Sequence, residues 1–408
     1  MEGNGLKTIM VIGTLDTKGE ENIFLKQSLE TYGYQTLLVD IGIMEQPDVT
    51  PDISAREVAL RAGYELEELK NSGKPSWCLE IMGKGASRIV SSLFEEHRID
   101  GIIGMGGGQG TFMISKAMAC LPVGFPKVLI STIATLDGDQ MQFFGIKDTM
   151  VLNPLVDISG VNSIFRMIVG KAVAALDGML RAEAPLKAAE KKVIAVSMWG
   201  VVTPCGNHIR EKLEQAGFEV WVFHTTGIGG KIMEDLIDQG SIQGLVDLSL
   251  PELSNPVCEG CYPDGAYRCT AAGRAGIPQV VIPGGVDMIR VVPPNPVPER
   301  FAGRKTYLHN ANLRFVRSNA EENKRIAGDL SEKLNQSNGK VTVILPLGGL
   351  SAVDKKGAAL YEPGTDEVLF QTLENKLCPQ IQLIKSKYHI NDADFAELAA
   401  DTILEMLA

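Results

Sequence analysis

Short apolar runs alternate with glycine-containing turns and longer segments of helical periodicity along almost the whole chain. Strands buried on both faces read as uninterrupted apolar runs, and crossover helices fill the intervals between parallel strands. The alternation predicts an α/β fold with mainly parallel sheets and crossover helices. In the first half, strands are expected at residues 7–14, 35–42, 101–106 and 127–132. Helices are expected at residues 20–32, 55–68, 85–97, 110–119 and 160–180.

The same pattern restarts after a charged, alanine-rich segment at residues 181–192. Strands are expected there at residues 192–199, 219–225, 244–249, 278–283, 341–347 and 381–387, with a last helix at 393–407. A chain of 408 residues is long enough for two cores. We therefore expect two Rossmann-like subdomains, residues 1–185 and 186–408, with a cleft between them. The connection 284–312 contains PPNPVP, so it is expected to lack regular structure and to act as a lid.

Charge and cysteine content exclude several classes of protein. The chain has 50 acidic and 39 basic side chains and no basic run, so no nucleic acid partner is expected. No stretch reaches the ~18 uninterrupted apolar residues of a membrane span, and the N-terminus lacks the pattern of a secretion signal. Seven scattered cysteines predict reduced thiols rather than disulfides. The expectation is a cytoplasmic protein without a membrane partner.

The turn after the first expected strand reads GTLDTKG, residues 13–19, and leads directly into a helix. A helix start presents unpaired N–H groups and the positive end of the helix dipole. Thr14 and Thr17 add hydroxyls and Lys18 adds a positive charge, which together favour an anion. Asp16 suits a helix cap, a ribose hydroxyl or a metal ion better than a phosphate. The alternative is a helix-capping turn with a solvated lysine.

A second turn between a strand and a helix reads GMGGGQGT, residues 104–111. Its glycines remove side chains where phosphates would approach the backbone, at an entropic cost that a purely structural turn would not require. The alternative is a tight turn that lets strand and helix pack closely. Neither turn has the G-x-x-x-x-G-K-[ST] or the G-x-G-x-x-G spacing, so both familiar nucleotide motifs are excluded.

Two further segments point toward the same edge of the sheet. MGKGASR, residues 82–88, is expected to be a small-residue helix start whose Lys84 could close over a triphosphate, although a plain helix start is equally consistent. STIAT, residues 131–135, offers three hydroxyls, with ordinary Ser/Thr turn chemistry as the alternative.

With GTLDTKG, GMGGGQGT and STIAT in this order, the sequence resembles the ATP-binding domain family of the plant tobamovirus-resistance protein and its bacterial relatives. The resemblance continues in SMWGVVTPCGN (197–207), FHTTGIGGKIMEDL (223–236), PGGVDM (283–288), HNANLRFVRSNAEEN (309–323), LPLGGLSAVD (345–354) and KYHINDADFA (387–396). It implies a Rossmann-like N-terminal subdomain that binds ATP, a second α/β subdomain, and a homodimer. By matching residues, the ATP contacts would fall on Asp16, Thr17, Lys18, Lys84, Gly107, Gly108, Gln109, Gly110 and Thr111. Mg²⁺ could accompany the nucleotide beside Asp16.

The second half places polar residues at its own expected strand ends, namely His224, Glu252, Asp287, His309 and His389. His224, Glu252 and His309 are candidates for proton transfer, and hydrogen-bonded structural histidines are the alternative. The cysteines at residues 258–269 resemble half of a zinc site, and Cys205 at a helix start could be a nucleophile. For both, unreactive thiols are the favoured interpretation.

These observations favour an ATP-binding protein whose downstream role they do not assign. The first alternative is an enzyme, a hydrolase, lyase or transferase, acting on a small phosphorylated or carboxylated metabolite in the cleft between the subdomains. The second is an interaction module in which nucleotide binding exposes a partner surface.

Overall fold

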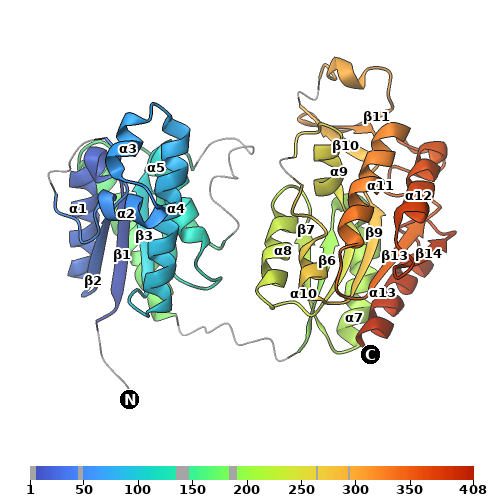
Figure 1. Cartoon of the computed structure of the whole chain (residues 1–408), viewed down its shortest axis with the longest axis horizontal. Coiled ribbons are helices and arrows are strands. Elements are labelled where there is room, and N and C mark those ends of the chain that lie inside the picture. The colour runs from blue at the N-terminus through green and yellow to red at the C-terminus, as the bar shows by residue number, and fades with distance from the viewer. Residues whose placement is uncertain (1–5, 45–48, 135–146, 183–190, 263–264, 293–294) are drawn as a thin grey trace. The chain divides into compact units, whose positions relative to one another are not determined.

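The computed structural model describes residues 6–44, 49–134, 147–182, 191–262, 265–292 and 295–408. The chain divides into two compact units, Met1–Lys187 and Ala188–Ala408. Each unit has a parallel sheet covered by helices (Figure 1). The predicted α/β class with parallel sheets and crossover helices is confirmed. Within the described ranges, no helix combines the length and the apolarity that crossing a membrane demands.

The N-terminal unit contains a five-stranded parallel sheet in the order β2-β1-β3-β4-β5. The strands are β1 (Thr8–Gly13), β2 (Gln35–Asp40), β3 (Gly101–Gly106), β4 (Lys127–Ser131) and β5 (Met150–Leu152). Four of them correspond to predicted apolar runs. β5 was not expected, because three residues are too short a run to stand out from a loop.

Helices cover both faces of this sheet. One face packs against α1 (Leu15–Thr31) and α6 (Ser163–Arg181). The other packs against α2 (Ala55–Ala62), α3 (Leu66–Asn71), α4 (Pro75–Glu95) and α5 (Gly108–Ala119). Because β1 leads to a helix on one face and its neighbour β3 leads to a helix on the other, the carboxyl ends of β1 and β3 form a topological switch point.

Three helix predictions for this unit are corrected. The helix expected at residues 20–32 begins five residues earlier, at Leu15. The single helix expected at residues 55–68 is divided into α2 and α3 by Gly63, whose φ of 94° ends α2 in a left-handed cap. The helix expected at 85–97 begins ten residues earlier, at Pro75. Its glycines serve packing: a Cβ on Gly83 would lie 3.0 Å from Lys116 of α5, and one on Gly85 would lie 2.0 Å from the Val58 carbonyl oxygen of α2.

The C-terminal unit contains a six-stranded parallel sheet in the order β14-β13-β9-β8-β6-β7. The strands are β6 (Val193–Met198), β7 (Glu219–His224), β8 (Gly244–Ser249), β9 (Gln279–Gly284), β13 (Val341–Pro346) and β14 (Gln382–Ser386). One face packs on α7 (Thr203–Gln215) and α13 (Ala393–Leu407). The other packs on α8 (Gly229–Asp238), α9 (Pro251–Val257), α10 (Ala271–Ala275), α11 (Ala320–Leu334) and α12 (Pro363–Lys376).

A three-stranded antiparallel sheet lies at one end of this unit's main sheet, above it in Figure 1, in the order β10-β12-β11. Its strands are β10 (Met288–Val291), β11 (Thr306–Asn310) and β12 (Leu313–Arg317), and a short 3₁₀ helix spans Glu299–Phe301. The prediction that residues 284–312 lack regular structure is therefore wrong. The prolines of PPNPVP, the first two of which lie outside the described residues, fall within one connection, and strand-forming residues flank it.

Candidate functional site

A cavity of about 770 Å³ lies in the N-terminal unit where β1, β2 and β3 end. This is the edge where open α/β sheets bind ligands, and it includes the switch point between β1 and β3. The volume falls in the range of about 300–1,000 Å³ typical of small-molecule sites. Its wall includes the starts of α1, α4 and α5, whose N-termini direct positive dipole ends toward one space.

Four residues at the start of α1 belong to this wall, namely Thr14, Asp16, Thr17 and Lys18. The hydroxyls of Thr14 and Thr17 lie 3.1 Å apart. Most of the N–H groups of this turn already have protein partners. Leu15 N donates to Asp40 Oδ1 at 3.0 Å, and Lys18 N donates to the Thr14 carbonyl oxygen at 2.9 Å. The turn therefore offers an anion its hydroxyls and the Lys18 ammonium group more than its amides.

Asp16 connects this turn to the loop after β2. Its Oδ2 accepts hydrogen bonds from Ile43 N and Met44 N, both at 2.9 Å. A Cβ on Gly42 would lie 2.5 Å from the Asp16 carboxyl carbon, so glycine at position 42 makes room for this carboxylate. Among the described residues, Asp16 Oδ1 is buried without a hydrogen-bond partner. Burial, supported by the nearby Asp16 charge, raises the pKa of Asp40 against the hydrogen bonds it accepts.

The turn between β3 and α5 brings Gly107, Gly108, Gln109 and Gly110 to the cavity. Its glycines fall into two groups. A Cβ on Gly106 would lie 2.9 Å from the backbone of Gly110, so packing requires that glycine. A Cβ added at Gly107, Gly108 or Gly110 would meet no atom closer than 3.7 Å, and none of the three has a positive φ. Neither a Cβ clash nor backbone conformation therefore requires glycine at these three positions.

The first N–H groups of α5 are open. Thr111 N makes the first helical bond, to the Gly107 carbonyl oxygen at 2.8 Å, and the N-cap Gly107 has no side chain to accept from the others. Within the described ranges, the N–H groups of Gly108, Gln109 and Gly110 have no acceptor. Three adjacent donors at a helix start form a ready anion site.

The last turn of α3 and the N-cap of α4 add two lysines that the sequence analysis did not single out. Lys70 and Lys74 both line the cavity; Lys70 pairs with Glu67 at 3.1 Å, while Lys74 is exposed at the N-cap of α4. In the part of the chain that the structure describes, neither Lys74 nor Lys18 has a carboxylate partner. The proline at helix position N1 and the preceding KNSGK turn are the signals that could have located this helix start.

Two residues implied by the resemblance do not line the cavity. Thr111 is fully buried, and its hydroxyl lies 2.7 Å from Ser131 Oγ, so it anchors α5 to the end of β4. Lys84 is exposed in the middle of α4, where no free N–H groups remain. The expectation of a helix start at Lys84 is therefore wrong. The last residue of STIAT, Thr135, and the segment 136–146 lie outside the described residues.

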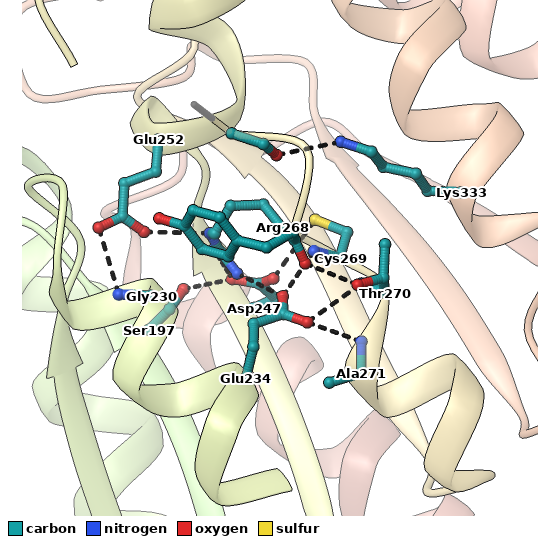
Figure 2. A network of polar contacts seen from close by, with 12 residues as sticks. Ser197, Gly230, Glu234, Asp247, Glu252, Arg268, Cys269, Thr270, Ala271 and Lys333 are labelled. Atoms are coloured by element: carbon teal, nitrogen blue, oxygen red, sulfur yellow. Dashed lines mark hydrogen bonds and ion pairs between the residues drawn. The ribbon is translucent and has the colours of Figure 1, made fainter. Parts of the chain in front are cut away.

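In the C-terminal unit, Glu252 occupies the glycine-rich turn after β7. Its Oε1 accepts from Gly227 N at 2.7 Å and from Gly230 N at 3.2 Å, as Figure 2 shows for Gly230. A Cβ on Gly230 would lie 1.8 Å from Glu252 Oε2, so glycine is required there. Glu252 is 1% exposed, and burial raises its pKa while Arg268 lowers it. This carboxylate fills the place that a phosphate would take.

Arg268 is the centre of a buried ionic network around Glu252 (Figure 2). The guanidinium lies 3.1 Å from Glu252, 3.0 Å from Glu234 and 2.8 Å from Asp247, and all four side chains are buried. Glu234 also accepts from the backbone N–H groups of Cys269, Thr270 and Ala271. The ion pair with Arg268 therefore gives the Glu252 carboxylate a structural partner.

The histidine candidates lie apart from this network. His224 is exposed at the end of β7, and His309 is exposed on β11, with Nδ1 3.5 Å from the Tyr307 hydroxyl. No hydrogen bond or ion pair among the described residues joins His224, Glu252 and His309. His389 Nδ1 accepts from Asn391 N at 3.1 Å, so Nε2 donates to the Ser351 carbonyl oxygen at 2.9 Å.

Asp287 belongs to a second buried cluster at the carboxyl edge of this unit. It accepts from Ser351 Oγ at 2.7 Å, while Arg317 pairs with Asp366. Burial, followed by the charge of Asp354, raises the pKa of Asp287 to about 7. Burial also raises the pKa of Asp366 to about 8, against the lowering effect of Arg317.

Stability is expected to depend on pH through these two carboxyls. Because their folded-state pKa values exceed the unfolded ones, the folded chain binds more protons between about pH 4 and pH 8. The free energy of unfolding should fall as pH rises through this window, by up to about 1.4 kcal/mol per unit for each carboxyl. Urea unfolding from about pH 5 to pH 8 measures the slope, which Asp287→Asn should flatten. An unchanged slope in that variant would contradict the assignment.

Cys205, Cys258 and Cys269 are buried thiols. Burial raises the pKa of Cys205 far above its ordinary value, which argues against the weaker interpretation of Cys205 as a nucleophile. Burial likewise raises the pKa of Cys258 and Cys269. Among the described residues, no group of three potential metal ligands is placed to hold a metal ion.

Two doubly wound α/β units, the first with a cavity at its switch point, define a two-domain Rossmann-like protein. The models of the uncharacterised protein family UPF0261 match residues 7–185, as its N-terminal domain, and residues 191–407, as its C-terminal domain. The chain belongs to this family.

Relatives include bacterial and plant proteins. A UPF0261 protein of Clostridium tetani is 40% identical over 98% of this chain and 99% of its own length. One from Rhizobium meliloti is 36% identical over 97% of this chain and 98% of its own. The ToMV resistance protein Tm-1(GCR237) of Solanum lycopersicum is 36% identical over 80% of this chain but 44% of its own length. The predicted kinship with the plant protein is thereby confirmed.

Solved structures that match the chain weakly include UDP-N-acetylglucosamine 2-epimerases. One is 11% identical with a TM-score of 0.26, covering 92% of each chain. That of Methanocaldococcus jannaschii is 10% identical with a TM-score of 0.25, covering 98% of this chain and 93% of that one. A likeness at this level carries no information about a ligand.

Proposed function

We propose that the N-terminal unit binds ATP in the cavity at the ends of β1, β2 and β3. The observation that carries the proposal is the group Gly107, Gly108 and Gly110, which line the cavity although a Cβ at each would meet no atom closer than 3.7 Å. Space kept free beside three open N–H groups suits phosphates. The downstream role of the bound nucleotide is left unassigned.

Charge and shape support a nucleoside polyphosphate over a single small anion. Lys18, Lys70 and Lys74 supply three cations around the cavity of about 770 Å³. Apolar side chains line another part of the same cavity, namely Ile41, Ile43, Leu69, Leu79 and Met113. An apolar wall beside convergent polar groups suits a base beside its phosphates. The family resemblance implies ATP as that nucleotide.

Asp16 would hold the Mg²⁺ that accompanies the nucleotide. Mg²⁺ prefers oxygen ligands and in nucleotide sites takes one or two carboxylates together with phosphate oxygens. Asp16 Oδ1 fits this requirement, since it is buried and has no partner among the described residues. Asp16 Oδ2 is already held by two backbone amides, which fixes the orientation of the carboxylate.

Calorimetric titration of Mg-ATP tests the proposal. Lys18→Ala should lower the affinity by about 1.5–3 kcal/mol, because a charged contact with phosphate is lost. Lys84→Ala is the matched control: Lys84 is also a lysine of this unit, but it is exposed in mid-helix away from the cavity, so affinity should not change. Equal affinities of wild type and Lys18→Ala, or no heat from ATP with wild type, would refute the proposed site.

A further inference from the structure

The backbone of α1 breaks at Lys18, whose φ of −134° and ψ of 32° are not helical. In an uninterrupted helix, consecutive side chains leave the axis about 100° apart, so three in a row cannot face one side. Asp16, Thr17 and Lys18 nevertheless all line the cavity. The break allows Lys18 to join its two neighbours there.

Asn22 lies beneath this break. It is fully buried one turn further along α1, and its Nδ2 donates to the Lys18 carbonyl oxygen at 2.8 Å. It also fits against the end of β1, because a Cβ on Gly13 would lie 2.4 Å from Asn22 Oδ1. Asn22 therefore contacts both the strand end and the broken helix. A side chain that bonds within the backbone ladder is an established cause of helix kinks.

Core packing does not explain an asparagine at this position. Asparagine is a poor residue for a helix interior, and a buried polar atom without a partner is destabilising. Asn22 Oδ1 is such an atom within the described ranges. An apolar side chain would carry neither penalty. Within the described ranges, the bond to the Lys18 carbonyl oxygen is the one hydrogen bond that the Asn22 side chain makes, and an apolar replacement could not make it.

We propose that Asn22 is the positioning residue of the cavity: its amide holds the break at Lys18 and so directs the Lys18 ammonium group toward the phosphates. This inference rests on the proposed function and adds a buried residue that acts on the ligand only through Lys18. Sequence patterns did not indicate it, because Asn22 lies outside the GTLDTKG turn.

A double-mutant cycle measures this dependence. Mg-ATP is titrated into wild type, Asn22→Ala, Lys18→Ala and the double variant. Asn22→Ala should weaken binding roughly tenfold or more, approaching Lys18→Ala, and the double variant should bind no more weakly than Lys18→Ala. The salt dependence of the affinity should weaken equally in both single variants, because both lose the same charged contact. A purely structural role would not change that dependence.

Asn323 provides a matched control. It is a fully buried asparagine of α11 whose Nδ2 donates to the Thr365 carbonyl oxygen at 2.9 Å and whose Oδ1 also has no partner among the described residues. Asn323→Ala should lower stability and leave ATP affinity unchanged. If Asn22→Ala fails to fold, Asn22→Leu keeps the branching of the side chain at Cγ and removes the donor.

The outcomes separate the two proposals. If Asn22 variants melt at lower temperature but keep wild-type affinity and salt dependence while Lys18→Ala binds weakly, the positioning role is overturned and the ATP site stands. If wild type and every variant bind no ATP, the proposed function fails, and the role of Asn22 fails with it.

Discussion

Replacing Arg268 by methionine is expected to destabilise the C-terminal unit by about 3–5 kcal/mol. The guanidinium is fully buried and is the shared ion-pair partner of Glu234, Asp247 and Glu252. Without it, three buried carboxylates would face one another with no cation beside them. Each would have to take up a proton or let water in, and both responses favour the unfolded chain.

Urea unfolding followed by tryptophan fluorescence measures this loss. Trp199 and Trp221 report on the C-terminal unit, so a Trp77→Phe background removes the tryptophan of the other unit. Arg274→Met is the matched control: its guanidinium also pairs with a carboxylate, that of Asp238 at 2.7 Å, but it is 57% exposed, so less than about 1 kcal/mol should be lost. A loss at Arg268 no larger than that at Arg274 would show that the network does not hold the unit together.

The strands were predictable from the sequence because their signal is local. Each buried parallel strand is an apolar run, and the runs at 101–106 and 244–249 coincide with β3 and β8. The order of strands in each sheet was not predictable, because it depends on which runs meet across long stretches of chain. The antiparallel strands β10 and β11 were missed because the six residues PPNPVP lie between them. These prolines led to the whole segment 284–312 being predicted as irregular.

The site was predictable in part for the same reason. Asp16, Thr17, Lys18 and residues 107–110 follow apolar runs directly, and parallel strands bring such turns to one edge. Lys84 was misplaced because Gly83 and Gly85 resemble a helix start, whereas they allow α4 to approach α5 and α2. A single sequence does not contain the packing partner that requires a small residue. The third helix start, at Pro75, was hidden by the same error.

The two glycine-rich turns show that composition alone does not predict whether a ligand binds. Residues 227–230 and 107–110 both span the start of a helix that follows a strand. Glu252 accepts from the amides of the first turn, whereas the amides of the second have no such acceptor within the described ranges. Glu252 lies more than twenty residues from the turn it fills. Glycine content therefore indicates exposed amides, and only the three-dimensional neighbour determines whether the protein or a ligand occupies them.

Gly108→Leu should move stability and ligand affinity in opposite directions. Gly108 is the first residue of α5, and a Cβ there would have no atom closer than 4.0 Å. Leucine is a better helix former, so the free energy of unfolding should stay equal or rise by up to about 1 kcal/mol. The added side chain would stand where phosphates meet the open amides, so ATP affinity should fall roughly a hundredfold or more, equivalent to about 2.7 kcal/mol.

Gly170→Leu separates the helix effect from the ligand effect. Gly170 is an exposed glycine of α6 with no atom within 4 Å of an added Cβ, and it lies away from the cavity lining. This variant should gain helix stability and keep wild-type affinity. Gly106→Ala should instead lower stability, since its Cβ would collide with the Gly110 backbone at 2.9 Å. Wild-type ATP affinity in Gly108→Leu would mean that the open amides of α5 do not hold phosphate, whereas a loss of stability there would mean that the glycine serves the fold.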